Sequence, residues 1–186
     1  QQGKDRMKKK ILPAVSLVFV FTTLFLCSPV SAGSSEYGVS AGYGQSRDNI
    51  DIFRLGVQKQ FSRRWFESGI GFLSGYFELS YNRWDKSGEQ THGVALSPVF
   101  AYYFDTGKGR DITPYVEGGI GAAYIDDYKI AGRNLSSNLQ FEDRISLGVI
   151  INQIDIKLGY MHYSNGSLKS PNDGINIWIG TVTWHF

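Results

Sequence analysis

Hydrophobic residues alternate with small or charged residues along most of the chain beyond its first thirty positions. The region 92–104 shows the pattern, since one parity carries large side chains and the other small ones: Val94, Leu96, Pro98, Phe100, Tyr102 and Phe104 against Gly93, Ala95, Ser97 and Ala101. In 141–150, Glu142 and Arg144 likewise stand on the parity opposite to the large apolar residues. Because successive side chains of a strand project to opposite faces, this period of two predicts strands with one apolar face.

The alternation predicts eight strands, over 36–44, 49–60, 65–81, 92–104, 113–125, 141–150, 153–164 and 175–186. An even number of antiparallel strands closes a barrel with both termini at one end. The connections at 62–64, 105–112 and 152–153 are mostly short, whereas those at 82–90, 126–138 and 165–174 are longer. Since outer-membrane barrels have short periplasmic turns and longer outer loops, we expect an all-β, eight-stranded antiparallel transmembrane β-barrel with periplasmic N- and C-termini.

The parity opposite to the apolar one holds polar side chains that an ordinary core would not tolerate side by side: Arg54, Gln58, Glu67, Glu117, Glu142, Arg144, Asp155 and Lys157. In an eight-stranded barrel these can fill the interior and pair with one another. Glycines of that parity make room for them, namely Gly69, Gly71, Gly119 and Gly121. We interpret the charges as structural, with a proton or ion pathway as the alternative. A lipocalin-like soluble barrel also stays open, because parity alone does not separate inside from outside.

The beginning of the chain has a different pattern. Lysines at 8–10 precede an apolar run over 11–26, and Val30-Ser31-Ala32 offers small residues for cleavage. This order is typical of a secretory signal peptide. A transmembrane anchor is the alternative, but the run is shorter than the roughly 20 residues that a spanning helix needs. We therefore expect upstream residues plus a signal peptide over 1–32 and the barrel, without cysteine, over 33–186.

The charges and the aromatic residues indicate which class of partner the chain has. The formal net charge is +2, and the lysines and arginines are scattered along the chain. A nucleic-acid partner needs a clustered basic surface, so we predict none. The last predicted strand instead carries Trp178, Trp184 and Phe186 on its apolar parity. Aromatic residues at the ends of a lipid-facing stripe are typical of a membrane interface, which favours the outer-membrane interpretation.

His162 and Ser164 are the candidate catalytic residues. They stand two positions apart in the seventh predicted strand, so their side chains project from the same face. That face is the apolar one, shared with Ile156 and Leu158. A histidine there can take the hydroxyl proton while the serine attacks an acyl carbonyl. The alternative is a pair of polar residues at the rim of the bilayer, wetted by headgroups, and the spacing alone does not decide between the two.

The other histidines do not suggest a metal site. His92 stands near a predicted loop, and His185 lies on the inward parity of the last strand. Neither has a partner two or four positions away that is suited to a metal, so we predict no metal. The Gly42-Tyr43-Gly44 cluster lacks a following helix pattern, which argues against a phosphate-binding loop.

The segment around the His-x-Ser pair resembles a known family. Residues 159–175 read GYMHYSNGSLKSPNDGI and resemble the C-terminal signature of the PagL-type lipid A deacylases. The segments 96–100, 114–122 and 141–143 agree with that family too, so the resemblance spans most of the predicted barrel. It implies an eight-stranded barrel in the bacterial outer membrane. It also implies a serine esterase without a cofactor that removes the ester-linked 3-hydroxyacyl chain at the 3-position of lipid A in the outer leaflet.

The resemblance also implies roles for individual residues. Ser164 corresponds to the nucleophile and His162 to the base, at a site facing the outer leaflet. Three further residues match positions that support the oxyanion: Asn165, Gly166 and Asn172. The family's triad ends in a glutamate, and Asn176 stands in its place. An amide oxygen can fix the tautomer of the imidazole but supplies no charge to stabilise imidazolium, so we expect a slower enzyme.

Several alternatives to this interpretation stay open. Asp173 is an alternative carboxylate in the loop before Asn176. A non-catalytic small outer-membrane barrel with a degenerate triad, used for adhesion or envelope structure, is the alternative function. Basic residues of the predicted outer loops are either solvated or hold the anionic lipopolysaccharide substrate, namely Arg83, Lys86, Lys129, Arg133 and Lys169. A homodimer is left open as well.

Overall fold

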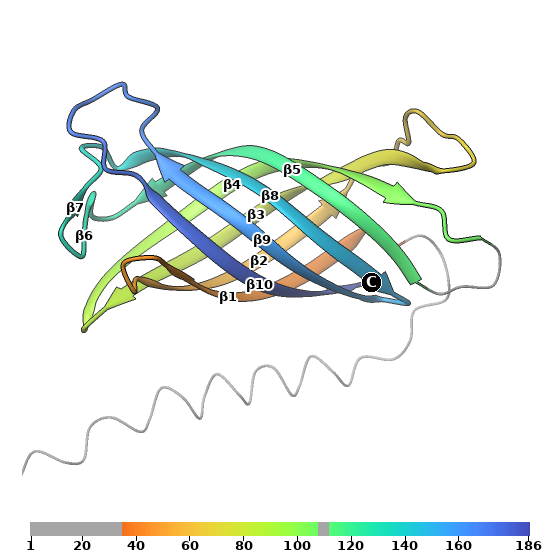
Figure 1. The fold of residues 1–186 in the computed structure, drawn as a ribbon, viewed down its shortest axis with the longest axis horizontal. Helices are drawn as coiled ribbons and strands as arrows, with labels where there is room; N and C mark the ends of the chain where they lie inside the picture. Colours follow the sequence, from red (N-terminus) through yellow and green to blue (C-terminus); the bar gives the residue numbers. More distant parts are fainter. Residues whose placement is uncertain (1–34, 108–111) are drawn as a thin grey trace, which may run out of the picture. The chain divides into compact units, whose positions relative to one another are not determined.

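A computed structural model describes residues 35–107 and 112–186. Eight long strands close into one barrel in the order β1-β10-β9-β8-β5-β4-β3-β2, and every neighbouring pair is antiparallel (Figure 1). The barrel strands are β1 (Tyr37–Ser46), β2 (Asp51–Gln60), β3 (Gly71–Lys86), β4 (Glu89–Phe104), β5 (Ile112–Ile125), β8 (Leu139–Ile151), β9 (Ile154–Ser164) and β10 (Ile175–His185). The predicted fold class is confirmed. The signal peptide predicted over 1–32 lies outside the described residues.

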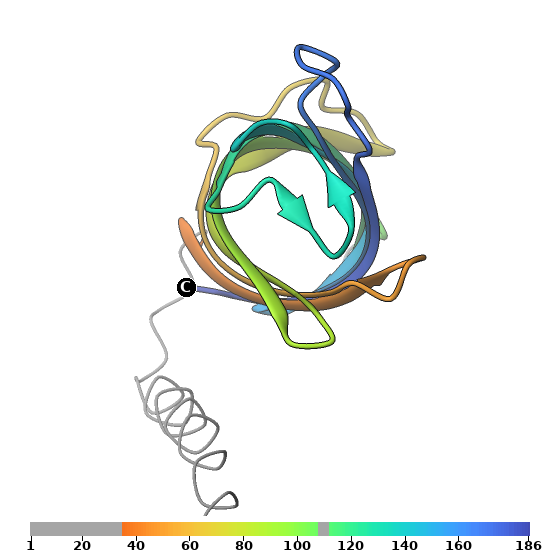
Figure 2. The same cartoon turned by 90° about the vertical axis from the view of Figure 1, so that its left-hand side faces the viewer.

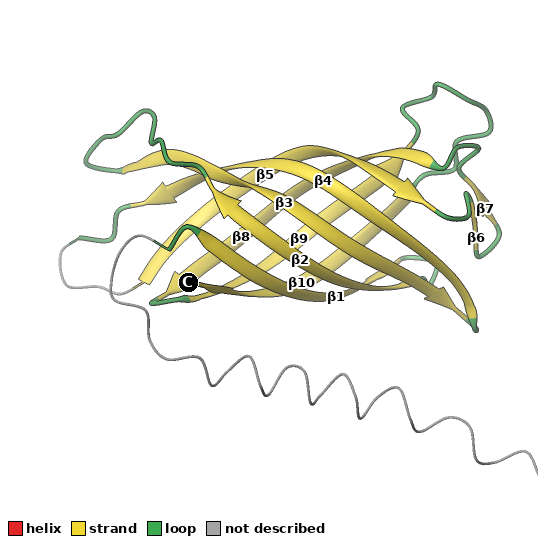
Figure 3. Cartoon of the chain, turned by 180° about the vertical axis from the view of Figure 1, so that it is seen from behind, coloured by secondary structure: helices red, strands yellow, loops and turns green. Residues whose placement is uncertain are grey.

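Secondary structure in the described part of the chain consists of strands and loops (Figure 3). Besides the barrel, β6 (Lys129–Ile130) and β7 (Arg133–Asn134) form a small hairpin of their own. Within the described ranges, no helix is long and apolar enough to span a membrane.

The two ends of the barrel differ. One end, called the terminal end here, carries residue 35 and Phe186, since Tyr37 and Phe186 exchange backbone hydrogen bonds of 3.2 and 2.9 Å. The opposite end, the loop end, carries the connections 47–50, 87–88, 126–138 and 165–174. Viewed from the loop end, the β6–β7 hairpin lies across the mouth of the barrel (Figure 2). Ile130 of β6 and Leu135, which follows β7, are buried in the core cluster, so this hairpin packs on the core at the barrel mouth.

The apolar parity of the strands faces outward. Leu147 and Ile120 are 68% and 66% exposed, and they belong to a band of exposed apolar side chains that runs around the wall. The charged parity is buried, as Arg54, Glu78 and Glu142 show. A soluble lipocalin-like barrel would have the reverse arrangement, so that alternative is wrong. An outward apolar band with a polar interior is typical of a barrel that spans a membrane.

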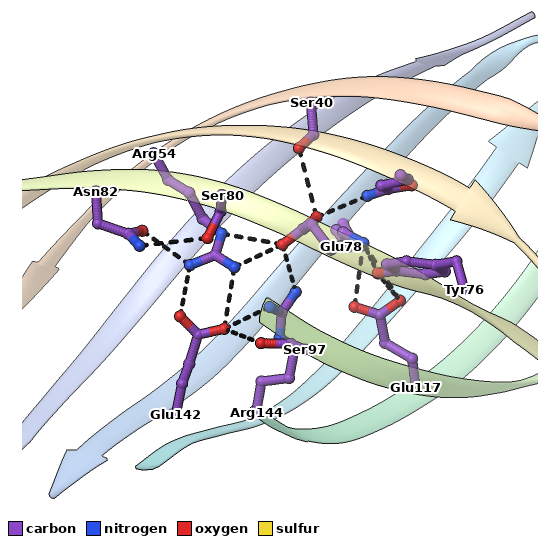
Figure 4. Close-up of polar contacts among 12 residues, drawn as sticks. Ser40, Arg54, Tyr76, Glu78, Ser80, Asn82, Ser97, Glu117, Glu142 and Arg144 are labelled. Atoms are coloured by element: carbon purple, nitrogen blue, oxygen red, sulfur yellow. Dashed lines mark hydrogen bonds and ion pairs between the residues drawn. The ribbon is translucent and has the colours of Figure 1, made fainter. Parts of the chain in front are cut away.

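The buried charges pair inside the barrel (Figure 4). Arg54 and Arg144 each bridge Glu78 and Glu142, with N–O distances between 2.5 and 2.9 Å. A second cluster joins Lys157 to Glu117 at 3.1 Å. Each charge thereby gains partners that offset its loss of hydration. The side chains lining the gap between the two clusters leave a cavity of about 10 Å³. This part of the interior is therefore packed, which supports the interpretation that the buried charges are structural.

Two of the predicted elements are wrong. The strand predicted over 65–81 begins only at Gly71, and residues 61–70 form an irregular connection at the terminal end. Glu67 and Gly69 lie in that connection and are exposed, not interior. The misleading pattern begins with Trp65, an aromatic residue that packs on the outer wall, since its ring centroid lies 6.4 Å from that of Phe100.

The loop predicted over 82–90 is also wrong. β3 and β4 continue through this polar region to the turn residues Ser87 and Gly88, whose φ angles of 55° and 92° suit a tight hairpin. Polar residues form the ends of these strands beyond the apolar band. In the sequence such a polar stretch is typical of a loop. The loop end therefore includes the short turns 47–50 and 87–88, and the terminal end includes the long connection 61–70, so connection length does not orient this barrel. The periplasmic position of the termini stays a prediction.

Candidate active site

His162 and Asn176 face each other across two neighbouring strands. They are direct partners in the register of β9 and β10. The Nδ1 atom of His162 lies 2.7 Å from the Oδ1 atom of Asn176, which is hydrogen-bond distance. Because an amide oxygen only accepts, this contact places the ring proton on Nδ1 and leaves Nε2 as an acceptor. The structure thus brings together the two residues that sequence reasoning paired.

Ser164 is the last residue of β9 and lies on the same outward face as His162. Its partner in the register of β8 is Phe141. The side chain is 9% exposed. Its Oγ atom accepts a long hydrogen bond of 3.4 Å from the Gly166 N–H, and no hydrogen bond joins it to His162 among the described residues. Contact between hydroxyl and imidazole therefore requires one of these two side chains to change its position.

The loop 165–174 is fixed by Asn165. Its Nδ2 group donates to the backbone oxygens of Leu135 and Lys169 at 2.7 and 3.0 Å, and its backbone N–H donates to Oδ1 of Asn172 at 3.2 Å. These bonds tie the residue after Ser164 to two loops at once. Of the three residues expected near the oxyanion, Gly166 meets Oγ of Ser164 through its N–H and Asn172 is bonded to the residue after Ser164, whereas the side-chain amide of Asn165 holds the loops together.

Gly174 packs against the ring of His162. The sequence pattern did not single it out. Its φ is +58°, and a Cβ atom there would lie 2.9 Å from Cε1 of His162. Only glycine meets both conditions without strain, since the left-handed conformation and the close approach each disfavour a side chain. The sequence signal that points to it is the Asp-Gly pair, which is typical of a turn.

Asp173, the alternative carboxylate for the triad, is bonded to another loop. Its Oδ2 atom accepts the backbone N–H of Asn134 at 2.6 Å. Arg133 reinforces the same junction, because it donates to the backbone oxygens of Asp173 and Gly174 and pairs with Asp48. The carboxylate of Asp173 and the guanidinium of Arg133 thus join the 126–138 and 165–174 connections at the loop end.

The remaining basic candidates differ in their surroundings. The Nη2 atom of Arg83 lies 3.8 Å from the Oδ2 atom of Asp85. Lys129 and Lys169 line an open cleft of about 500 Å³ between the β6–β7 region and the 165–174 loop. The cleft lies next to the residue that follows Ser164, because Asn165 donates to the backbone oxygen of Lys169 at 3.0 Å. It is a candidate surface for an anionic group of a substrate.

The other histidines are engaged elsewhere. Nδ1 of His92 lies 2.6 Å from the hydroxyl of Tyr81, and Nε2 of His185 lies 3.9 Å from a carboxylate oxygen of Asp155. Across residues 35–107 and 112–186, no group of three or more His, Cys, Asp and Glu side chains is placed to hold a metal ion.

The family whose model is described as lipid A 3-O-deacylase (PagL) matches residues 51–185. This chain belongs to the PagL family. Two relatives named lipid A deacylase PagL are similar to it over almost their whole length. The one from Pseudomonas aeruginosa is 35% identical and aligns over 90% of this chain and 93% of its own. The one from Bordetella bronchiseptica is 30% identical and aligns over 96% and 98%.

A solved structure agrees with the family assignment. The crystal structure of the outer membrane enzyme PagL matches this barrel with a TM-score of 0.74 at 33% identity, and it covers 79% of this chain and 98% of the other. The resemblance to the PagL family found in the segments 96–100, 114–122, 141–143 and 159–175 is confirmed.

Proposed function

We propose that this chain is an outer-membrane esterase that hydrolyses the ester-linked 3-hydroxyacyl chain at the 3-position of lipid A, with its site facing the outer leaflet. Membership of the lipid A 3-O-deacylase family supports the substrate and the bond that breaks. The observation that carries the residue roles is the 2.7 Å contact of His162 with Asn176, two positions from Ser164 on the outward face of the wall. The substrate is itself part of the bilayer, so an outward site meets it directly.

His162 acts as the base in this proposal. With its proton on Nδ1 and bonded to Asn176, its Nε2 atom is free to take the proton of the Ser164 hydroxyl. The Oγ atom of Ser164 then bonds to the ester carbonyl carbon and forms a tetrahedral oxyanion. Collapse of this intermediate breaks the bond to the sugar oxygen, which receives the proton from Nε2. Lipid A leaves with a free 3-hydroxyl, and the acyl chain stays on Ser164.

A water molecule completes the reaction. His162 takes a proton from the water, whose oxygen attacks the acyl-serine carbonyl, and the Oγ atom of Ser164 leaves with the proton returned by Nε2. The products are the free 3-hydroxy fatty acid and the unmodified serine. Each step uses groups of this protein and water.

Two groups of the 165–174 loop are the proposed oxyanion donors. The N–H of Gly166 already meets the oxygen of Ser164 at 3.4 Å, and it turns to the substrate oxyanion when Oγ moves toward the carbonyl. Asn172 is held beside the nucleophile through its bond with the Asn165 N–H, and its amide nitrogen is the second donor. Loss of one such donor costs roughly 10²- to 10³-fold in rate.

Lipid A from cells that express the wild type or the Ser164→Ala variant tests this function. Mass spectrometry should show the loss of one 3-hydroxyacyl chain with the wild type and intact lipid A with Ser164→Ala at equal barrel abundance. Unchanged lipid A with both proteins would count against the proposal and favour a non-catalytic barrel.

A further inference from the structure

Asp143 lies beside His162 on the outside of the barrel. It is the direct partner of His162 in the register of β8 and β9, just as Asn176 is its partner in β10. Glu142 and Arg144 on either side of it point inward and are buried, so Asp143 projects from the outward face. The three side chains Asp143, His162 and Asn176 therefore form one row across three neighbouring strands.

A carboxylate at this position requires a physical reason. The other outward positions of β8 carry apolar side chains that suit a lipid-facing wall: Leu139, Phe141, Ile145 and Leu147. A charged side chain on such a face is destabilising, and an ionisable residue there indicates a functional site. In the described part of the chain, Asp143 makes no hydrogen bond and no ion pair. Its charge is thus available to a neighbour that becomes positive.

We infer that Asp143 is a positioning residue that supplies the negative charge which Asn176 lacks and thereby stabilises the imidazolium of His162 during turnover. This inference rests on the proposed function. Directly opposed side chains in a sheet have Cβ atoms about 4.5–5.5 Å apart, close enough for a strong charge interaction in a poorly solvated wall. The interaction is electrostatic and not a hydrogen bond, because Asn176 occupies Nδ1 and Ser164 requires Nε2.

The other groups around His162 do not serve this purpose. Asn176 on β10 is neutral, and Gly174 covers the edge of the ring. Tyr160 is the outward neighbour on β9 itself. On the loop, the carboxylate of Asp173 is bonded to the backbone of Asn134, and Lys169 lines the cleft beyond. Asp143 is accordingly the carboxylate that faces the imidazole from the adjoining strand.

The first test compares Asp143→Asn with the wild type in lipid A deacylation. We expect kcat to fall about 10- to 100-fold with KM within about twofold, since the change removes charge and keeps shape. The acid limb of the pH profile of kcat/KM should move to lower pH, because loss of a nearby negative charge favours the neutral imidazole. A merely structural role would not move that limb. Asp51→Asn, at an outward carboxylate on β2, is the matched control and should stay within twofold.

The second test places the same change in an Asn176→Glu background. A glutamate at 176 supplies charge from β10, so Asp143→Asn should cost several-fold less there than in the wild type. Equal kcat and an unmoved pH profile for Asp143→Asn in an active wild type would overturn the inference and leave the proposed function intact. Absence of deacylation by the wild type would overturn both. Asp143→Asn should keep the heat-modifiable migration of the folded barrel.

Discussion

The Nδ1 atom of His162 lies 2.7 Å from the amide oxygen of Asn176, at a position where β9 and β10 place the two residues directly opposite each other. This contact joins two members of the proposed triad through a neutral acceptor. An amide fixes the tautomer of the imidazole as a carboxylate does, but it leaves the imidazolium without a counter-charge at this side.

Replacing Asn176 should change the rate in opposite directions. Asn176→Glu adds the missing charge and is expected to raise kcat about 10-fold, whereas Asn176→Leu removes the acceptor and is expected to lower it about 10- to 100-fold. Steady-state deacylation in mixed micelles measures both. A gain of activity in Asn176→Leu would show that the contact with His162 has no catalytic role.

Gly174→Ala should impair the site through His162. The new Cβ atom would lie 2.9 Å from Cε1 of the ring, and the φ of +58° adds strain. Because a displacement of about 1 Å near a reacting group can cost roughly 10²-fold, we expect kcat to fall by one to two orders of magnitude. Gly88→Ala is the control, since its φ of +92° carries the same kind of strain but a Cβ there meets no atom within 4 Å. Equal activity of the two variants would argue against the packing explanation.

The cleft lined by Lys129 and Lys169 should bind the phosphate groups of lipid A. The double change to alanine is expected to raise KM about 3- to 10-fold and to weaken the dependence of KM on salt, with kcat nearly unchanged. The comparison uses lipid A with and without its phosphates. Lys59→Ala at the terminal end serves as the control because Lys59 is exposed and lies far from the loop end. A KM increase of equal size for dephosphorylated lipid A would contradict this assignment.

Arg54 should be important for the stability of the barrel. It pairs with Glu78 and Glu142 inside, so Arg54→Met leaves two buried carboxylates with one cation between them. We expect a loss of about 3–5 kcal/mol, read from urea unfolding in micelles. Adding Glu142→Gln removes one unpaired charge and should recover part of that loss. Unchanged stability in Arg54→Met would show that the network contributes little.

The period of two predicted the barrel because it reports the environment of each face directly. It placed Arg54, Glu142 and Lys157 inside, and the structure agrees. It failed over 65–70, before β3 begins, where Trp65 packs on Phe100 of the outer wall at 6.4 Å between ring centroids and Phe66 is 79% exposed. Alternation shows which face a residue occupies, but not whether the segment pairs with another strand.

The site was only partly predictable for the same reason. His162 and Ser164 are close in sequence, so the strand period alone places them together. Asp143 stands beside His162 through the β8–β9 register, which depends on the turn at 152–153 and on pairing along the whole hairpin. The direction of the Asn165 side chain depends on Leu135, thirty positions away. Contacts of this kind follow from the closed barrel and not from local pattern.

The most direct measurement of the central claim uses the purified barrel reconstituted in vesicles that contain lipid A. A time course by mass spectrometry should show that the wild type releases one 3-hydroxy fatty acid from the 3-position of each lipid A. Ser164→Ala should release it at least about 10³-fold more slowly, because the nucleophile is gone. Release of the fatty acid by Ser164→Ala at the rate of the wild type would contradict the assignment of Ser164 as the nucleophile.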